Sequence, residues 1–344
     1  MGAGSSGGSQ LGAGSSGGSP LVSSSSGSQP TACASYVGGP VPSSTGFDAS
    51  AMPVVVSNGP VTVPSTKGFV AYDANSTGIS RDIFVTTADG SCRRQLVGSP
   101  ATEKQPAFSP DGGKLAYASD ATGVFQIYIL DIATGLTRQM TNEPGGATYP
   151  AFSPGGTELA FVSGDPEGDT GSGSGVLEIL DLATGVVRPV LPPYGQPWLS
   201  PEFASDTLVL TGSGSALVAY HLDTNTSCAV VPLNGRIPNP RDPSPAPDGI
   251  RYVFSDFCGD APQLYIGRID GSTGDTCLGA FRLATVDGGV ESPDWGPFGM
   301  IAGETKDGRI LLFPEDGSAP LPLVSGGPAR NPAFAPATFT QSCP

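Results

Sequence analysis

Side chains able to do acid, base or metal chemistry are scarce in this sequence, and histidine is the scarcest of them. The chain has 344 residues and one histidine, His221. That single imidazole excludes most metalloenzyme and triad chemistry, which depends on His as ligand or base. His221 lies in the apolar stretch Ala219–Asp223, where a histidine is more often packed than catalytic. We therefore expect that the chain has no catalytic residue and is not an enzyme.

Three carboxylates form the only spacing that suits a metal. Asp165, Glu167 and Asp169 alternate in the Gly-rich stretch 164–175, and oxygen ligands of this kind suit Ca²⁺. The stretch lacks the twelve-residue order and the closing Glu of an EF-hand. A solvated loop is the favoured interpretation, so we expect no cofactor, and Ca²⁺ bound by these side chains is the alternative.

Two aromatic residues in a Pro-rich stretch are the candidates for ligand contact. Tyr194 and Trp198 lie within residues 190–199, which we expect to connect two structural units. Aromatic rings on rigid connections suit contact with a carbohydrate or a protein. Packing against a neighbouring unit is the alternative.

Composition narrows the class of protein and of partner. Lys and Arg number 16 against 31 Asp and Glu, a net charge of −15, so we expect no nucleic-acid partner, because binding to phosphates needs clustered basic residues. Apolar runs such as 125–130 are far shorter than the ~18 residues of a transmembrane helix. The 50 Gly and 35 Pro residues disfavour helices. A soluble, acidic, all-β protein is indicated.

The N-terminal part differs in composition from the rest. Residues 2–9, GAGSSGGS, recur as residues 12–19, and such a sequence behaves as a flexible coil. We expect residues 1–50 to form a disordered tether and residues 51–344 to fold. The tether is similar to the leash of mature bacterial lipoproteins, which implies a lipid tether at the N-terminus and a place in the periplasm, at the outer membrane or outside the cell. Position 1 is Met rather than Cys, so a cytoplasmic protein with a flexible start is the alternative.

The cysteines favour an oxidising compartment. There are six, with no C-x-x-C spacing, an even set compatible with disulfides. Cys33 and Cys343 flank the folded part, so that a bridge between them would join its ends. Buried free thiols are the alternative.

An internal repeat organises the folded part. The segment Pro106-Ala-Phe-Ser-Pro-Asp-Gly112 returns as Pro150-Ala-Phe-Ser-Pro-Gly-Gly156, and weaker copies begin at Pro201, Pro243, Pro293 and Pro332. A period of roughly 40 to 50 residues is typical of propellers or helical arrays. Short apolar segments such as 114–119, 126–131 and 158–163 follow the copies, and turns of the type Asp-x-x-Thr-Gly separate them. No helical periodicity is present.

Each unit is therefore predicted to be four antiparallel strands joined by short turns, with Asp111 and Asp248 as turn caps. Counting the units predicts a six-bladed β-propeller of four-stranded antiparallel blades. Its ring closes in one of two ways. Either the last copy, at residues 332–334, supplies the innermost strand of the first blade, or residues 61–63 do so.

The string Pro-x-Phe-Ser-Pro-Asp-Gly-x-x-Leu-Ala-Tyr at 106–117 resembles the WD40-like PD40 repeat of TolB-type propellers, and the resemblance spans residues 60–340. It implies a rigid ring used as a binding surface. The family includes periplasmic partners of lipoproteins, propellers attached to peptidases and sugar-active enzymes. Residues 1–60 lack the length and pattern of the additional N-terminal α/β domain of TolB.

Two functions follow as hypotheses. The first is a non-enzymatic, monomeric scaffold that binds a protein partner at the bacterial envelope or cell surface. The second is a glycan-binding or glycan-active propeller. Clustering of Asp, Glu, Trp and Tyr at one mouth of the ring would favour the second hypothesis, and scattered placement would favour the first.

Overall fold

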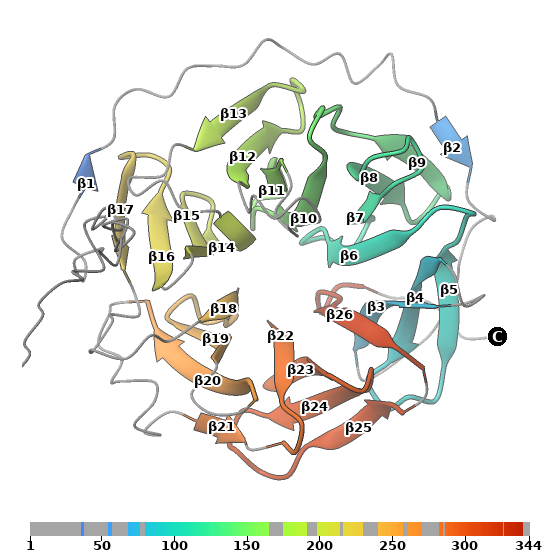
Figure 1. Ribbon diagram of the computed structural model, residues 1–344, viewed down its shortest axis with the longest axis vertical. Coiled ribbons are helices and arrows are strands. Elements are labelled where there is room, and N and C mark those ends of the chain that lie inside the picture. The colour runs from blue at the N-terminus through green and yellow to red at the C-terminus, as the bar shows by residue number, and fades with distance from the viewer. Residues whose placement is uncertain are drawn as a thin grey trace, which may run out of the picture.

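The computed structural model shows an all-β ring of six sheets, as predicted (Figure 1). It describes residues 36–37, 54–56, 68–75, 80–164, 175–190, 198–213, 216–229, 240–256, 261–269, 282–284, 286–325 and 327–339. These ranges contain no helix, and so none that could cross a membrane.

Each blade is an antiparallel meander whose first strand lies innermost, at the centre of the ring (Figure 1). We number the blades by their order along the chain. From the inside outwards, blade 1 consists of β26 (Ala329–Phe334), β3 (Phe69–Asn75), β4 (Arg81–Thr87) and β5 (Arg93–Val97); blade 2 of β6 (Glu103–Phe108), β7 (Lys114–Ser119), β8 (Gln126–Asp131) and β9 (Leu136–Gln139); blade 3 of β10 (Ala147–Phe152), β11 (Glu158–Ser163), β12 (Val176–Asp181) and β13 (Val187–Val190). Blade 4 consists of β14 (Trp198–Ser205), β15 (Leu208–Ser213), β16 (Ala216–His221) and β17 (Thr226–Ala229); blade 5 of β18 (Arg241–Pro245), β19 (Arg251–Asp256), β20 (Gln263–Arg268) and β21 (Arg282–Ala284); blade 6 of β22 (Val290–Trp295), β23 (Met300–Thr305), β24 (Ile310–Pro314) and β25 (Leu321–Val324).

The C-terminal strand closes the ring. β26 pairs with β3, so that Phe334 lies opposite Val70 and Arg330 opposite Asp73. The first of the two predicted closures is therefore the correct one, and residues 61–63 lie outside the described residues. Closure pairs two strands that would otherwise be open edges prone to aggregation.

Two short strands before the first blade pair with outer edges of the ring. β1 (Tyr36–Val37) pairs with β17 of blade 4, and β2 (Val54–Val56) pairs with β9 of blade 2. Residues 1–35 lie outside the described residues, and the predicted tether boundary at residue 50 stays a prediction.

The hydrophobic core lies between neighbouring blades rather than at the centre. Ala116 and Ile127 of blade 2 pack in one cluster with Phe161 and Leu180 of blade 3, and equivalent clusters fill the other blade junctions. Middle strands such as β7 and β11 bury side chains on both faces, because each blade is covered on both sides by its neighbours. Polar residues are therefore left to the turns and to the central channel.

Aspartates cap the turns at the face where the innermost strands end. Ser109 Oγ and Gly113 N both donate to Asp111 Oδ1, at 2.6 and 2.9 Å. Ile250 N and Arg251 N donate to Asp248 Oδ1, at 2.8 and 2.9 Å. Both residues are turn caps, as predicted. The bonds from Ser109 and Gly113 hold the pKa of Asp111 below its usual value. At Asp248 burial acts to raise the pKa, but the bonds from Arg251 and Ile250 outweigh it and lower the pKa to about 2.

The third-to-fourth-strand turn of blade 2 offers a test of such caps. Asp131 Oδ1 accepts hydrogen bonds from Thr134 N at 2.9 Å and Thr134 Oγ1 at 2.8 Å. We expect Asp131→Ala to lower the free energy of unfolding by about 1 kcal/mol, because the turn loses bonds with no replacement inside the protein. Thr157→Ala, at an exposed turn residue, is the control and should change it by less than about 0.5 kcal/mol. Urea unfolding measures both, and equal effects would contradict the capping role.

Cys92, at the turn before β5, is disulfide-bonded in the structure. The proposed partners Cys33 and Cys343 lie outside the described residues, so the bridge between them stays a prediction.

Candidate functional site

A left-handed residue interrupts the innermost strand of every blade. In each of these strands the residue before a proline has a positive φ, between 45° and 57°, and the pairing with the second strand shifts register beside it. We call these six residues the left-handed ring; they are Asn331, Gln105, Tyr149, Ser200, Asp242 and Ser292, in blades 1 to 6. Positive φ is uncommon outside glycine and marks a position that the surroundings must hold in place.

The strand positions around this ring form successive levels of a channel. The level before it contains Arg330, Lys104, Thr148, Leu199, Arg241 and Glu291. The level just after it is proline in all six blades, and the next contains Ala333, Ala107, Ala151, Glu202, Ser244 and Asp294. Charged residues thus lie at the end of the channel where the innermost strands begin. We call this end the channel mouth.

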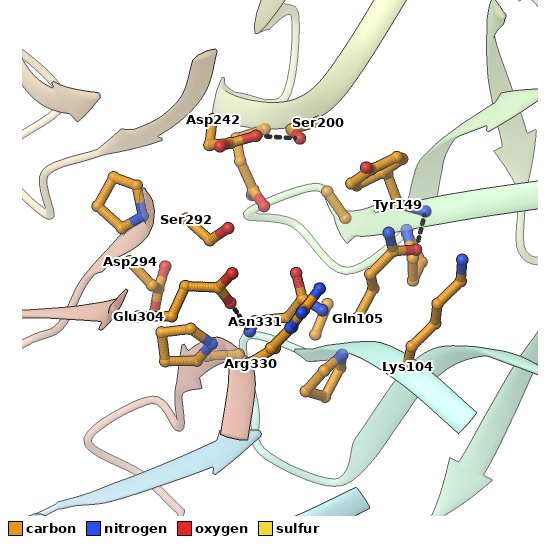
Figure 2. Close-up of a pocket in the computed structure, with 18 of the residues that line it drawn as sticks. Lys104, Gln105, Tyr149, Ser200, Asp242, Ser292, Asp294, Glu304, Arg330 and Asn331 are labelled. Carbon is orange, nitrogen blue, oxygen red and sulfur yellow. Dashed lines mark hydrogen bonds between the residues drawn. The ribbon is translucent and has the colours of Figure 1, made fainter. Parts of the chain in front are cut away.

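The channel is a cavity of about 780 Å³ lined by all six innermost strands. Figure 2 shows its polar side chains, with Asp242, Asp294 and Glu304 on one side of the view and Lys104 and Gln105 on the other. The lining includes the carboxylates Glu202, Asp242, Glu291, Asp294 and Glu304 and the cations Arg81, Lys104, Arg241 and Arg330. The acidic residues belong to blades 4 to 6.

Side chains from one blade satisfy backbone groups of the next. Tyr149 N donates to Gln105 Oε1 at 3.0 Å, and Asn331 N donates to Glu304 Oε2 at 2.5 Å. Ser200 Oγ donates to Asp242 Oδ1 at 2.6 Å. These bonds join blades 2 to 3, 6 to 1 and 4 to 5. They support the left-handed ring, because two of its backbone N–H groups and the hydroxyl of Ser200 have acceptors in the neighbouring blade.

Asp73, on the second strand of blade 1, ties together three elements. Its Oδ1 accepts Gln105 N of blade 2 at 3.1 Å and Asn331 Nδ2 of the closing strand at 2.7 Å. Its Oδ2 lies 2.8 Å from Arg81 Nη1, and the Asp73 side chain is completely buried. Burial raises the pKa of Asp73 against the opposing effect of Arg81.

A second belt of bonds lies deeper in the channel. Asp294 of blade 6 accepts Ser244 Oγ of blade 5 at 3.0 Å and Phe334 N of blade 1 at 2.6 Å. Ser244 Oγ in turn accepts Trp295 N at 2.9 Å. Burial raises the pKa of Asp294 to about 6, although these donors favour its charged form. One aspartate thus joins three consecutive blades.

Two glutamates of the channel are also perturbed by burial. Burial raises the pKa of Glu304 to about 8, with the nearby charge of Asp73 adding to the effect. Burial, with the charge of Asp294, raises the pKa of Glu202 well above its usual value. Perturbed carboxyl groups in a cavity mark a candidate functional site, although structural networks perturb pKa values too.

Three of the four cationic residues of the lining lie on the level that begins the channel. Arg330 is exposed, whereas Lys104 is 5% exposed and its Nζ lies 3.8 Å from the centre of the Phe125 ring. A cation over an aromatic face is attracted by the ring quadrupole. The mouth therefore has cations in blades 1, 2 and 5 and a carboxylate, Glu291, in blade 6.

The residues singled out in the sequence are not among the described residues of this site. Asp165, Glu167, Asp169 and Tyr194 lie outside the described residues, as does the side chain of Trp198, so Ca²⁺ binding stays a prediction. Trp198 is the first residue of β14 rather than part of a connection. His221 ends β16, the third strand of blade 4, as the repeat predicted. Among the residues that the structure describes, no three His, Cys, Asp or Glu residues are grouped to hold a metal.

Sequence reasoning missed the residues that line the channel. Each left-handed residue immediately precedes the proline that begins a motif copy, so the motif starts one position after it and does not include it. The copy that begins at Pro106 reaches a turn five residues later. In blade 4 the residue after Pro201 is Glu202, and this difference resembles the ordinary divergence of a repeat. The signal in the sequence is that the residues beside the constant proline differ from one copy of the motif to the next.

Of the described acidic and aromatic side chains whose clustering would favour a glycan ligand, only the acidic ones gather at the channel. Carboxylates do gather in the channel, but Tyr149 is the one Tyr or Trp side chain described in its lining. Trp295 is 5% exposed and packs in the core between blades 5 and 6. Asp242, Asp294 and Glu304 are bonded to neighbouring blades, as described above.

Comparison with known proteins agrees with this architecture. The family model described as the TolB beta propeller domain, PD40, matches residues 54–299. A curated relative, "Protein TolB homolog" of Chlorobium luteolum, is 40% identical over 57 residues, which are 17% of this chain and 13% of that protein. The chain therefore matches only a small part of that relative's length.

Solved structures show the same fold at low identity. TolB from Acinetobacter baumannii superposes with a TM-score of 0.65 at 22% identity, covering 78% of this chain and 67% of that one. Putative TolB from Agrobacterium tumefaciens gives a TM-score of 0.56 at 17% identity, covering 78% of this chain and 92% of that one. With the family model matching well over half of its residues, the chain belongs to the TolB β-propeller (PD40) family.

Proposed function

We propose that this protein is a non-enzymatic, monomeric propeller that binds a protein partner at the channel mouth. The observation that carries the proposal is the cavity of about 780 Å³, which is lined by residues of all six blades and begins with charged side chains. A cavity of this size can accommodate a segment of another protein, and the charges at its mouth would select that segment.

The bonds between blades support a binding role. They hold the left-handed ring before any ligand arrives, so little conformational entropy is lost on binding. Asp242, Asp294 and Glu304 serve in this network, which gives these carboxyl groups a structural use without any reaction. A location at the bacterial envelope or cell surface is part of the proposal, supported by the Gly/Ser-rich tether and the six cysteines.

Site-specific photo-crosslinking tests the proposal. A photoreactive residue replaces exposed Arg330 at the mouth, and in a second variant it replaces Thr134, in a turn at the opposite face. We expect a protein from envelope extract to crosslink at position 330 and not at 134, and the purified partner to bind the ring directly. Crosslinking at 134 alone would place the interface elsewhere. A specific signal on a glycan array, with no protein crosslinked at 330, would favour the glycan hypothesis instead.

Charge reversal at the mouth gives a further prediction. Arg330→Glu is expected to weaken binding of the crosslinked partner about tenfold at low salt, because a charged residue at an interface mainly steers association. Arg138→Glu makes the same charge change at an exposed residue of the outer strand β9, and should leave binding unchanged. Surface plasmon resonance at two salt concentrations measures both variants. Equal losses would indicate an effect of net charge alone.

A further inference from the structure

Glu202 is a carboxyl group for which the fold has no use. It lies on the channel level where blades 1 to 3 have alanine, at Ala333, Ala107 and Ala151. The two other polar residues of this level, Ser244 and Asp294, are bonded to each other. No described residue donates a hydrogen bond to Glu202 or forms an ion pair with it, and its one electrostatic neighbour is the like charge of Asp294.

Glu202 is half-buried in the channel wall, so that its carboxylate loses part of its hydration without gaining a partner in the protein, which is unfavourable. Three blades avoid this cost with alanine, and the channel would close equally well if blade 4 did the same. The cost is explained if a ligand supplies the missing partner. The burial and the Asp294 charge, which raise the pKa of Glu202, describe the same unsatisfied state in the absence of such a ligand.

We propose that Glu202 is a subsite for a primary ammonium group, a lysine side chain or an N-terminus, on the protein segment that enters the channel. This inference rests on the proposed function and names the chemistry that the deep end of the same site recognises. The ammonium group donates charge-assisted hydrogen bonds to Glu202, which are about twice as strong as neutral ones.

A metal ion suits this position less well than an ammonium group. Both oxygens of Asp294 already accept bonds from blades 5 and 1, so that one free carboxylate remains where a metal requires several ligands. Within the described ranges no three acidic, His or Cys side chains are grouped for a metal. The cations at the mouth, Lys104, Arg241 and Arg330, also oppose entry of a bare cation, whereas cationic side chains can donate hydrogen bonds to the carbonyl oxygens of a peptide that carries one.

Binding should release a proton. Burial and the charge of Asp294 raise the pKa of Glu202 and so favour its protonated form. The ammonium group binds the ionised form, so any proton on the free carboxyl group passes to the buffer while the ligand keeps its own three. Proton release is thus a second signature, which a merely structural role of Glu202 would not produce.

The experiment uses acetyl-Gly-Gly-Lys-Gly-Gly-amide, which has one ammonium group, and the same peptide acetylated on the lysine Nζ. Ligand-detected NMR gives the affinity, and calorimetry in two buffers gives the proton count. We expect Glu202→Gln to weaken binding of the first peptide about tenfold or more and to abolish proton release. The Nζ-acetylated peptide should bind weakly to both proteins.

Glu315→Gln is the matched control, since it makes the same change in an exposed turn. It should leave affinity and proton release as in the wild type. Glu202→Gln conserves shape and removes a partly desolvated, unpaired charge, so its melting temperature should not fall. Equal affinity of wild type and Glu202→Gln for the lysine peptide would overturn the subsite, as would Ca²⁺ binding that depends on Glu202.

The two proposals fail separately. A partner that crosslinks at position 330, together with a peptide affinity indifferent to Glu202→Gln, would overturn the subsite and keep the proposed function. Peptide binding that depends on Glu202, with no protein crosslinked at 330, would confirm the ammonium subsite and overturn the proposed function.

Discussion

Replacing Asp73 with alanine is expected to lower the free energy of unfolding by about 3–5 kcal/mol. The substitution removes the acceptor of Gln105 N and Asn331 Nδ2 and leaves Arg81 without its counter-ion. Gln105 is 7% exposed, so its orphaned donor gains little from water. Because Asp73 joins blade 2 to the strand that closes blade 1, the loss falls on ring closure itself.

Urea unfolding followed by fluorescence of the buried Trp295 measures this effect. Asp307→Ala is the control, because Asp307 also pairs with an arginine, Arg309 at 2.9 Å, but is 62% exposed. An ion pair as exposed as this one contributes little to stability. Asp73→Asn should lie between the two, since it keeps an acceptor and loses the charge. A loss below 1 kcal/mol for Asp73→Ala would show that Asp73 does not hold the ring closed.

Stability is also expected to fall as the pH rises from about 5 to 8. Burial raises the pKa of Glu103 and Glu178 to about 7, of Glu304 to about 8 and of Asp294 to about 6. In the unfolded chain these groups ionise near pH 4. A group whose pKa is raised on folding stabilises the fold fully below its unfolded pKa, and this stabilisation is lost as the pH passes through the folded pKa.

The turn caps act in the opposite direction at lower pH. The pKa values of Asp111, Asp131 and Asp181 are lowered, chiefly by hydrogen bonds from their own turns. Their stabilisation is present above the unfolded pKa and is lost as the pH falls below about 4. Maximum stability is therefore expected in mildly acidic solution, between these two windows.

Melting temperatures at pH 5, 6.5 and 8 measure the profile. We expect Glu304→Gln to reduce its slope, because the amide keeps an oxygen for Asn331 N and cannot ionise. Since one pKa unit corresponds to about 1.4 kcal/mol, Glu304 alone should account for a loss on the order of 3 kcal/mol between pH 5 and pH 8. Glu315→Gln should keep the wild-type profile. A melting temperature that rises steadily to pH 8 would contradict the assignment of these groups.

The parts of the fold that the repeat predicted are those that depend on residues close together in the sequence. Two second strands, at 114–119 and 158–163, were predicted to the residue. Short apolar runs and Asp–Gly turns act over a few residues, so each strand carries its own signal. The weak copies at Pro201 and Pro293 also proved to be innermost strands.

The channel had no comparable signal. Glu202, Asp294 and Asp73 belong to blades 4, 6 and 1, and nothing near them in the chain indicates that they face one cavity. At Glu202 the departure from the repeat looked like sequence drift. In the structure it is the one unpaired carboxylate on its level of the channel wall, among the residues described.

Sequence alone determined the repeated strands, the turns and the number of blades, because short apolar runs and the hairpin turns that bound them are properties of neighbouring residues. Only the tertiary structure decided that β26 closes the ring and that side chains from six distant strands meet in one channel. Closure brings together groups separated by much of the chain, and their burial and mutual charge exist only after it has happened.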